Sequence, residues 1–278
     1  MNREYMLRIG FFFGIFVLVA LWEVIAARRK LGSPKARRWA GNLGIIFLNT
    51  LLVYWLLPVT AVGLAALSQA RGWGLLNNFP LPDGPALISG VITLDLAIYL
   101  QHVMFHAVPI LWRLHRVHHV DLDFDVTTGL RFHPIEIALS MLIKLAVVAF
   151  LGPSPTAVLI FEIILNGTSM FNHGNIKIPQ SLDRAFRLFV VTPDMHRVHH
   201  SILVRETNSN FGFNLPWWDR LFGTYRSQPA AGHEGMTIGI SEFRDRRSWS
   251  LPWMLALPFI GEAGSYPFSG RTGAGGPP

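Results

Sequence analysis

The sequence predicts an all-α fold: a polytopic membrane helical bundle of about four spans, two of them forming a shorter hairpin, with a cytoplasmic histidine-rich helical cap. Hydrophobic residues make up 51% of the 278 positions, charged residues only 15%, and the mean hydropathy is +0.36. A soluble domain usually carries about 25% charged residues. The formal net charge of +7 comes from basic residues at the ends of long apolar runs, which indicates contact with a membrane surface rather than with nucleic acid.

The first apolar run covers Ile9–Ala27 and is interrupted only by Glu23. A basic stretch at 28–30 follows without a small-residue cleavage site, so the run is predicted to be a retained transmembrane helix rather than a signal peptide. The loop that follows carries six basic residues and no acidic residue between positions 28 and 38. The positive-inside rule places this loop in the cytoplasm and the N-terminus outside.

Two further spans come next along the chain. The second is expected over Leu43–Leu67, with a kink at Pro58 because proline lacks a backbone N–H. Residues 71–85 are rich in Gly, Pro and Asn and are predicted to form a loop. The third span covers Ala86–Phe105 and runs inward, so we expect the histidine region to begin at the cytoplasmic face.

Two shorter apolar runs, Pro134–Leu151 and Thr156–Phe171, are joined by a turn at 152–155. They predict a helical hairpin that returns to the same side and either spans the membrane or dips into it. Lys144 and Glu162 lie at equal distances from the turn and would reach the same depth. Because an unpaired charge in the bilayer is costly, we expect an ion pair, in which exchanging the two charges does less harm than neutralising either one.

Beyond the hairpin the chain is more polar, and residues 174–247 are expected to form the cytoplasmic cap. Arg246–Gly261 is typical of an interfacial helix, with Trp249 and Trp253 suited to the level of the lipid headgroups. The tail Gly264–Pro278 is rich in Gly and Pro, and this composition predicts disorder.

The histidines carry the strongest functional signal, because ten of the eleven lie between His102 and His200. Spacings of i, i+3 and i+4 place side chains on one helical face, and neutral imidazole is the commonest metal ligand. Thr192-Pro193-Asp194 before the last group has the pattern of a helix start. The three groups are His102 and His106; His115, His118 and His119; and His196, His199 and His200.

The number of histidines indicates two metal ions rather than one. The groups supply eight imidazoles, and the isolated His173 and His133 raise the number to ten. One zinc or iron ion takes about four to six ligands, so a single closed site would leave several histidines unexplained. The chain has no cysteine, which excludes thiolate and Cys-ligated iron–sulfur sites. We interpret His133 either as a ligand or as a hydrogen-bond partner of one.

Carboxylates near the histidines are candidates for fixing the ligand rings. No Glu or Asp lies at helical spacing within the three groups, which separates the pattern from the Glu-x-x-His motif of carboxylate-bridged di-iron bundles. A nearby carboxylate can instead accept the second ring N–H of a ligand, although each is equally consistent with a helix cap or a surface charge. The candidates are Asp121, Asp123, Asp125, Glu136 and Asp194. His233, in a loop-like stretch, is expected at the surface.

An aromatic segment follows the last histidine group closely. It contains Trp217, Trp218, Phe222 and Tyr225. These side chains either line a lipid pocket or anchor the cap at the membrane interface, and the sequence leaves both interpretations open.

Taken together, these segments resemble the fatty acid hydroxylase / sterol desaturase superfamily. The resemblance rests on the motifs HxxxH, HxxHH, FHPIE, FNHGN and HRVHH, closed by NFGFNLPWWDRLFGTY, in this order between Asp95 and Arg226. It is close to the bacterial sterol desaturase branch. Members of this family are membrane enzymes with a histidine-bound di-iron centre that use O2 and external electrons to hydroxylate or desaturate lipids.

The resemblance implies that this chain is an O2-dependent non-heme di-iron oxidoreductase acting on a lipid C–H bond. It implies two iron ions, which zinc can replace in a purified sample, and an external electron donor of ferredoxin or cytochrome type. The expected location is the bacterial inner membrane, with the histidines on the cytoplasmic side and no nucleic-acid partner. The resemblance implies these ligand positions: His102, His106, His115, His118, His119, His173, His196, His199 and His200.

The resemblance also divides the chain and marks one departure from the family pattern. We expect an N-terminal transmembrane region over 1–84, a catalytic region over 85–230, and the interfacial helix and tail over 231–278. Several relatives have a further histidine pair where this chain has Asn175 after His173. One metal would then either have fewer imidazole ligands or bind through water held by Asn175.

Three other interpretations remain open at this point. A carotenoid hydroxylase is the nearest, since related histidine motifs occur there. A membrane metal transporter would place histidines along a pore, and a b-type heme protein would need matching pairs on facing helices. The sequence does not decide the substrate, the choice between hydroxylation and desaturation, the electron donor or the oligomeric state.

Overall fold

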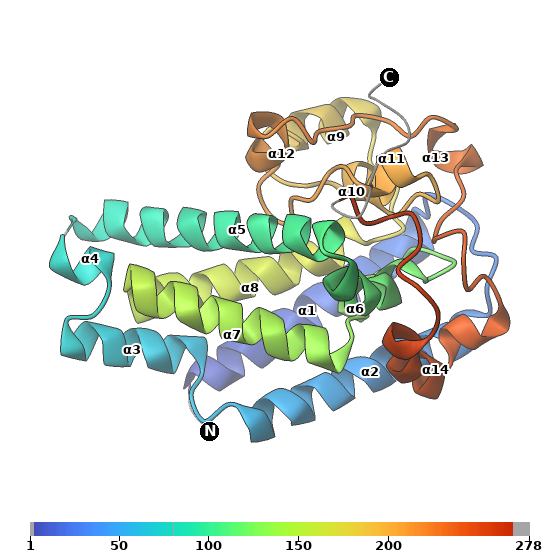
Figure 1. Cartoon of the computed structure of the whole chain (residues 1–278). Helices are drawn as coiled ribbons and strands as arrows, with labels where there is room; N and C mark the ends of the chain where they lie inside the picture. The colour runs from blue at the N-terminus through green and yellow to red at the C-terminus, as the bar shows by residue number, and fades with distance from the viewer. Residues whose placement is uncertain (1–2, 80, 269–278) are drawn as a thin grey trace.

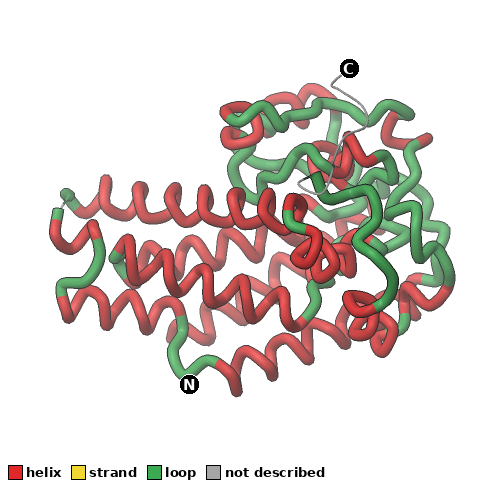
Figure 2. The backbone as a smooth tube through the Cα atoms, viewed as in Figure 1, coloured by secondary structure: helices red, strands yellow, loops and turns green. Residues whose placement is uncertain are grey.

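The computed structural model describes residues 3–79 and 81–268, and it confirms the all-α prediction. Long helices lie side by side and form a bundle, while short helices and loops gather at one end of it as a cap, at the right in Figure 1. Within the described residues there is no β-strand, as Figure 2 shows, and two isolated β-bridges join Ala27 to Ile176 and Ser201 to Ile238. The bundle consists of α1 (Arg3–Ile25), α2 (Lys35–Leu56), α3 (Ala61–Arg71), α4 (Leu75–Asn78), α5 (Asp83–Ala107), α7 (Pro134–Leu151) and α8 (Pro155–Asn172).

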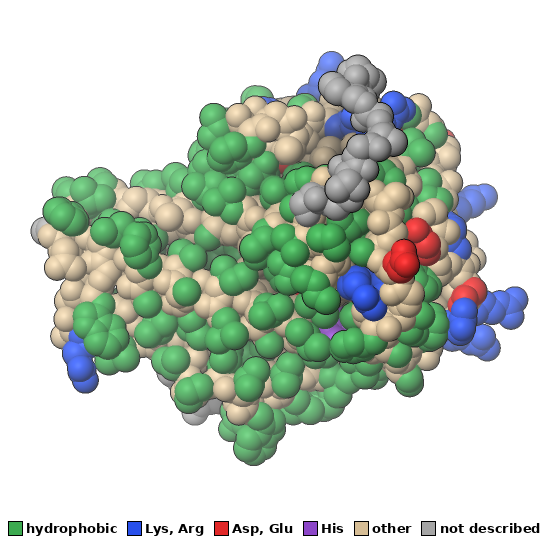
Figure 3. Space-filling view, viewed as in Figure 1, with side chains coloured by type: hydrophobic (Ala, Val, Ile, Leu, Met, Phe, Trp, Pro, Cys, Tyr) green, Lys and Arg blue, Asp and Glu red, His purple; other side chains and the backbone are tan. Residues whose placement is uncertain are grey.

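Four segments of the described chain are long and apolar enough to cross a membrane, in agreement with the expected number of spans. Many large hydrophobic side chains of the bundle helices are exposed, and on the face seen in Figure 3 they are spread along the length of the bundle. An exposed apolar surface of this extent requires hydrocarbon around it, because water would not tolerate it. The protein is therefore an integral membrane protein. The candidate spans are Glu4–Ile25, Lys35–Asn78, Asp83–Ala107 and Pro134–Leu151.

The second span differs from the expected Leu43–Leu67 helix with a kink. α2 ends at Leu56, and α3 begins at Ala61 after Thr60, whose side chain accepts the backbone N–H of Gly63. The sequence around Pro58 thus breaks the helix completely, because a new N-cap stabilises a separate start.

The predicted hairpin is confirmed. Ser154 caps α8 by accepting the backbone N–H of Ala157. Gly152 ends α7 with a φ of +65°, and a Cβ atom there would lie 2.5 Å from the carbonyl oxygen of Trp73. Only glycine allows this turn to pack against the α3–α4 connection.

The cap carries six of the histidines of the metal site on its short helices α6 and α10 or at their ends, and the N-terminal helices hold its loops in place. Arg38 of α2 pairs with Asp121 (Nε–Oδ1, 2.9 Å) and Asp125 (Nη2–Oδ1, 2.6 Å), all three fully buried. The helices of the cap are α6 (Pro109–His119), η1 (Thr128–Leu130), α9 (Gln180–Phe186), α10 (Pro193–His199), α11 (Val204–Thr207), α12 (Trp217–Leu221), α13 (Gly232–Gly235), η2 (Arg246–Trp249), α14 (Leu251–Ala256) and η3 (Leu257–Phe259).

The last part of the chain differs from the expected continuous interfacial helix. Residues 246–259 form η2, α14 and η3 as three short pieces, because Pro252 and Pro258 each start a new turn and cannot continue the preceding helix. The predicted start of the disordered tail, at Gly264, is too early in the sequence, since Tyr266 is buried and stacks on Trp112 with ring centroids 5.3 Å apart. The rest of the predicted disordered tail, 269–278, lies outside the described residues.

The predicted ion pair within the hairpin is confirmed, with Arg8 of α1 as a third member. Lys144 Nζ lies 2.8 Å from Glu162 Oε1, and Arg8 contacts the other carboxylate oxygen. The side chains of Lys144 and Glu162 are nearly buried. Because Arg8 would repel a lysine at position 162, exchanging the charges of Lys144 and Glu162 is no longer expected to be mild.

We therefore expect Glu162→Gln to lower the thermal midpoint in detergent more than Lys144→Met does. The first change leaves two cations beside each other without a counter-charge, whereas the second leaves Glu162 paired with Arg8. Breaking a buried pair typically costs roughly 3–5 kcal/mol. Equal midpoints for the two variants, or a lower midpoint for Lys144→Met, would contradict this arrangement.

Candidate metal centre

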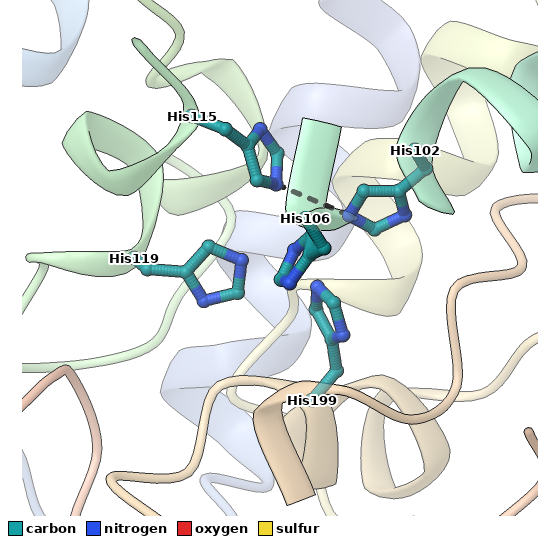
Figure 4. Close-up of side chains that lie close together, drawn as sticks. All are labelled: His102, His106, His115, His119 and His199. Carbon is teal, nitrogen blue, oxygen red and sulfur yellow. Dashed lines mark hydrogen bonds between the residues drawn. The ribbon is translucent and has the colours of Figure 1, made fainter. Parts of the chain in front are cut away.

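Nine histidines meet where α5, α6, α8 and α10 end together, and they divide into two groups. In the five-histidine group, one nitrogen from each ring lies within 4.8 Å of the others. Figure 4 shows these five rings pointing toward a common centre from three different helices. The five-histidine group consists of His102 and His106 of α5, His115 and His119 of α6, and His199 of α10.

The four-histidine group satisfies the same distance limit and consists of His118, His173, His196 and His200. His118 belongs to α6, His173 is the C-cap of α8, and His200 is the C-cap of α10. The groups adjoin, since the ring centroids of His119 and His200 are 4.6 Å apart.

Each HRVHH pentapeptide contributes to both groups. In α6 the i, i+4 pair, His115 and His119, joins the five-histidine group, and His118 turns to the other. In α10 the i, i+4 pair, His196 and His200, joins the four-histidine group, and the remaining histidine of that pentapeptide turns to the other. Helical spacing explains the division, because the i+3 position lies off the line joining i and i+4. The duplicated sequence motif therefore builds a paired site.

The outer nitrogens of several rings are fixed by oxygen atoms, which determines where the ring hydrogen sits. Carbonyl and carboxylate oxygens only accept hydrogen bonds, so these Nδ1 atoms carry the hydrogen and each Nε2 keeps a lone pair. The contacts of Nδ1 are His102 to the Phe211 carbonyl (2.7 Å), His106 to Asn208 Oδ1 (3.1 Å), His115 to Glu136 Oε1 (2.6 Å), His173 to the Ser169 carbonyl (2.7 Å) and His199 to the Ser209 carbonyl (2.8 Å).

The inner nitrogens of the five-histidine group then face one another without a hydrogen to share. His102 Nε2 and His115 Nε2 are 3.1 Å apart, the contact dashed in Figure 4, and both must be acceptors. The buried Nε2 atoms of His106, His119 and His199 have no hydrogen-bond partner. Lone pairs converging at this distance repel each other unless a cation lies between them.

In the four-histidine group an oxygen fixes the tautomer of His173, whereas the buried Nδ1 atoms of His118 and His196 have no hydrogen-bond partner. His173 Nε2 lies 3.1 Å from Nε2 of both His118 and His196, and neither ring nitrogen of His200 has a partner. Neighbouring corners of an octahedron with bonds of roughly 2.1 Å are about 3.0 Å apart. Each group therefore fits one transition-metal ion in its donor type, number and spacing.

Burial keeps the histidines of the cap neutral, as metal binding requires. It lowers the pKa of His115 and of His173 to about 3, because the imidazolium form loses its hydration. The same cause holds the pKa of five further histidines well below the ordinary value. At neutral pH all seven are uncharged: His115, His118, His119, His173, His196, His199 and His200.

His133, the tenth histidine expected at the metals, lies outside both groups. Its Nδ1 accepts the backbone N–H of Ile135 at 3.2 Å and caps α7, and its Nε2 donates to the carbonyl of Leu255 at 3.2 Å. Both nitrogens are therefore used, and no lone pair remains for an ion. A histidine before a proline that starts a helix has an N-cap role available, and this explains the difference from the expectation.

Of the carboxylates expected to orient ligands, Glu136 alone contacts a ring of the two groups within the described chain. Asp121 and Asp125 bind Arg38 instead, Asp123 accepts the backbone N–H groups of residues 32 and 33, and Asp194 pairs with arginines. These carboxylates stabilise the loops that carry the histidines.

Asn175 also stabilises a loop rather than the metal site. Its amide exchanges hydrogen bonds with the backbone of Arg29, through Oδ1 at 3.0 Å and Nδ2 at 2.8 Å. The side chain is therefore occupied by the loop after α1 rather than free to hold a metal-bound water.

His233 was expected at the surface, but it is buried, with its Nε2 3.6 Å from Asp194 Oδ2. Burial lowers its pKa to about 4. The partners that the sequence analysis missed are mainly backbone carbonyls, which leave no signal in side-chain patterns. Asn208 is the exception, since it is a side chain two residues before the quoted NFGFNLPWWDRLFGTY segment.

Comparison with known proteins agrees with this geometry. Residues 87–224, which contain all nine histidines of the two groups, match the family model described as fatty acid hydroxylase. An ornithine lipid hydroxylase of Rhizobium tropici is 30% identical over 51% of this chain and 42% of its own length. Human alkylglycerol monooxygenase (Homo sapiens) is 29% identical over 62% of this chain and 38% of its own length.

A cholesterol 25-hydroxylase of Rattus norvegicus is 27% identical over 80% of this chain and 74% of its own length. The chain thus spans about two fifths of the first two relatives and most of the third. No solved structure matches the chain. On the order of its histidine motifs, the geometry of the two groups and these matches, the chain belongs to the fatty acid hydroxylase/sterol desaturase superfamily.

Proposed function

We propose that this protein is a membrane di-iron oxygenase that hydroxylates or desaturates a lipid C–H bond, using O2 and electrons from another protein. The observation that carries the proposal is the pair of adjoining histidine groups whose inner lone pairs converge at the end of an apolar bundle. The relatives are named as lipid hydroxylases and monooxygenases, which supports the reaction class. The electron donor would be a ferredoxin or cytochrome type protein.

In this proposal the five-histidine group would hold one iron ion and the four-histidine group the other. When bound, the irons supply the activation of O2 and the oxidising power toward an unactivated C–H bond. The protein supplies the positions of the donor atoms. In five of the nine rings a hydrogen bond from Nδ1 to a fixed oxygen sets the tautomer and directs Nε2 inward, and for His115 that oxygen belongs to Glu136.

The surroundings of the rings exclude water, which protects a reactive centre from side reactions. All nine side chains are at most 3% exposed. Phe132 stacks on His118 with ring centroids 4.5 Å apart and an interplanar angle of 11°. The ring centroids of Phe213 and His102 are 5.0 Å apart, and Phe213 packs into the apolar core formed by α3, α5, α7 and α8. These apolar side chains beside the histidine rings are compatible with a hydrocarbon chain as the substrate.

The other interpretations fit these observations less well. A transporter would distribute ligands along the spans, whereas all nine histidines gather where α5, α6, α8 and α10 end. A heme protein would use two axial imidazoles and leave seven buried without a role. The basic loop after α1 contacts the cap through Asp123, which supports a cytoplasmic position of the histidines in a bacterial inner membrane.

The proposal is tested by comparing His118→Ala/His199→Ala, which removes one ligand from each group, with the wild type and with His133→Asn. We expect the double variant to retain fewer than two iron ions per chain and to lose its lipid product. His133→Asn should retain both, because asparagine can still cap α7. The measurements are elemental analysis after iron loading and lipidomics of expressing cells under O2 with a competent donor.

A wild-type protein that takes up fewer than two equivalents when fully loaded would contradict the two-iron proposal. Identical lipids in the strains that express the wild type and the double variant, with a substrate shown to be present, would contradict the oxygenase proposal. Loss of iron in His133→Asn would show that the assignment of ligands is wrong.

The role of Glu136 gives a separate prediction. Glu136→Leu removes the acceptor that fixes His115, and loss of such an outer partner typically lowers metal affinity or activity about 10–100-fold. We expect this loss in a chelator competition assay, whereas the exposed Glu234→Leu should bind iron like the wild type. Equal affinities for the two variants would show that Glu136 does not support the site.

A further inference from the structure

A groove of about 440 Å³ lies between α5 and the cap, within the range of roughly 300–1,000 Å³ typical of small-molecule sites. Tyr99, Leu100 and Val103 of α5 line one side. At one end Tyr99 stacks on Phe222, with ring centroids 5.4 Å apart, and its hydroxyl contacts that of Thr224 at 2.9 Å. The lining is thus mainly apolar and aromatic, with few polar groups.

The groove adjoins the five-histidine group. Asn208 lines it and bonds to His106 Nδ1 at 3.1 Å. Phe211 also lines it, and the centroid of its ring lies 5.1 Å from that of His106 and 5.5 Å from that of His102. One layer of side chains therefore separates a molecule in the groove from two rings of the group.

The mouth of the groove lies where α5 meets the cap, and it is surrounded by exposed apolar side chains. Leu100 is 50% exposed on a helix long enough to cross the membrane. On the cap side, Phe222 is 52% exposed, and Trp217 and Leu221 of α12 are exposed nearby. In Figure 3, hydrophobic side chains continue from the bundle onto the part of the cap above α5. Because apolar side chains surround the mouth, it suits a ligand that enters the groove from the bilayer.

Arg205 gives the groove one charged position. It lines the groove from α11, it is exposed, and no hydrogen bond or ion pair links it to any residue that the structure describes. Among the residues that the structure describes, no carboxylate lines the groove, and the adjacent Glu206 is buried and accepts the backbone N–H of Ala230. The cap side therefore presents a free cation, and the α5 side presents apolar surface.

We propose that this groove binds the hydrocarbon chain of an anionic amphiphile from the bilayer, with Arg205 on its phosphate or carboxylate headgroup. The inference rests on the proposed function, because it names the substrate class of the same site. Arg205 acts as a specificity residue: it touches the headgroup and takes no part in holding the metals. A guanidinium binds either anion through paired N–H donors, so the charge of the headgroup selects the ligand.

The test measures binding to the full chain in neutral detergent by native mass spectrometry. The probes are phosphatidylglycerol, oleic acid and phosphatidylcholine. The variants are Arg205→Gln, Val103→Trp, which fills the groove, and Arg184→Gln as the matched control, since Arg184 is exposed on α9 and does not line the groove. Thermal midpoints show that each variant is folded.

We expect Arg205→Gln to weaken binding of the anionic probes at least fivefold and to leave phosphatidylcholine unchanged, and Val103→Trp to weaken all three. If Arg205→Gln weakens binding of phosphatidylglycerol alone, the headgroup that Arg205 binds is a phosphate. If it weakens binding of oleic acid alone, the headgroup is a carboxylate. Equal binding by Arg205→Gln and Arg184→Gln, or no preference of the wild type for anionic probes, overturns the proposal.

The same binding is expected in His118→Ala, because His118 belongs to the four-histidine group and does not line the groove. If the lipids bind but the iron-loaded wild type forms no product with any of them, the result would count against the oxygenase and leave the groove in place. If the wild type forms product but does not prefer anionic headgroups, the groove proposal fails and the oxygenase proposal stands.

Discussion

The structure depends on nine buried imidazoles that converge on two points inside a dry end of a helical bundle. A buried polar atom without a partner costs about 1–3 kcal/mol, and several of these nitrogens have none. The arrangement is therefore unfavourable by itself and becomes favourable when cations fill both points. Under the proposed function, metal binding would therefore stabilise the cap, as in other proteins whose ligands converge only in the folded state.

The rest of the fold holds the rings against this repulsion. Arg38 joins α2 to Asp121 and Asp125, while one oxygen of Glu23 accepts the backbone N–H groups of Val126 and Asn175. The N-terminal helices thus fix the two loops that flank the hairpin. These buried charges do not contact the imidazoles, yet they set the positions of the segments on which the histidines lie.

Much of the site could be predicted from the sequence because helical spacing is a local property. The two HRVHH segments and the HxxxH pair predict converging rings without knowledge of the fold, and the turn between α7 and α8 is evident from its glycine and prolines. The outer partners could not be predicted in the same way. Three of the five are backbone carbonyls, which every residue possesses. The burial of His233 and the addition of Arg8 to the Glu162 pair depend on contacts distant in sequence.

The central claim is that imidazole nitrogens dominate the coordination of two ions. X-ray absorption spectroscopy of the fully iron-loaded protein in detergent tests it most directly. We predict a first shell of nitrogen and oxygen with the outer-shell scattering of four to five imidazoles per iron, which is the number that the two groups offer. A first shell with the scattering of two imidazoles or fewer per iron would contradict the account, because most of the buried lone pairs would then have no ion to bind.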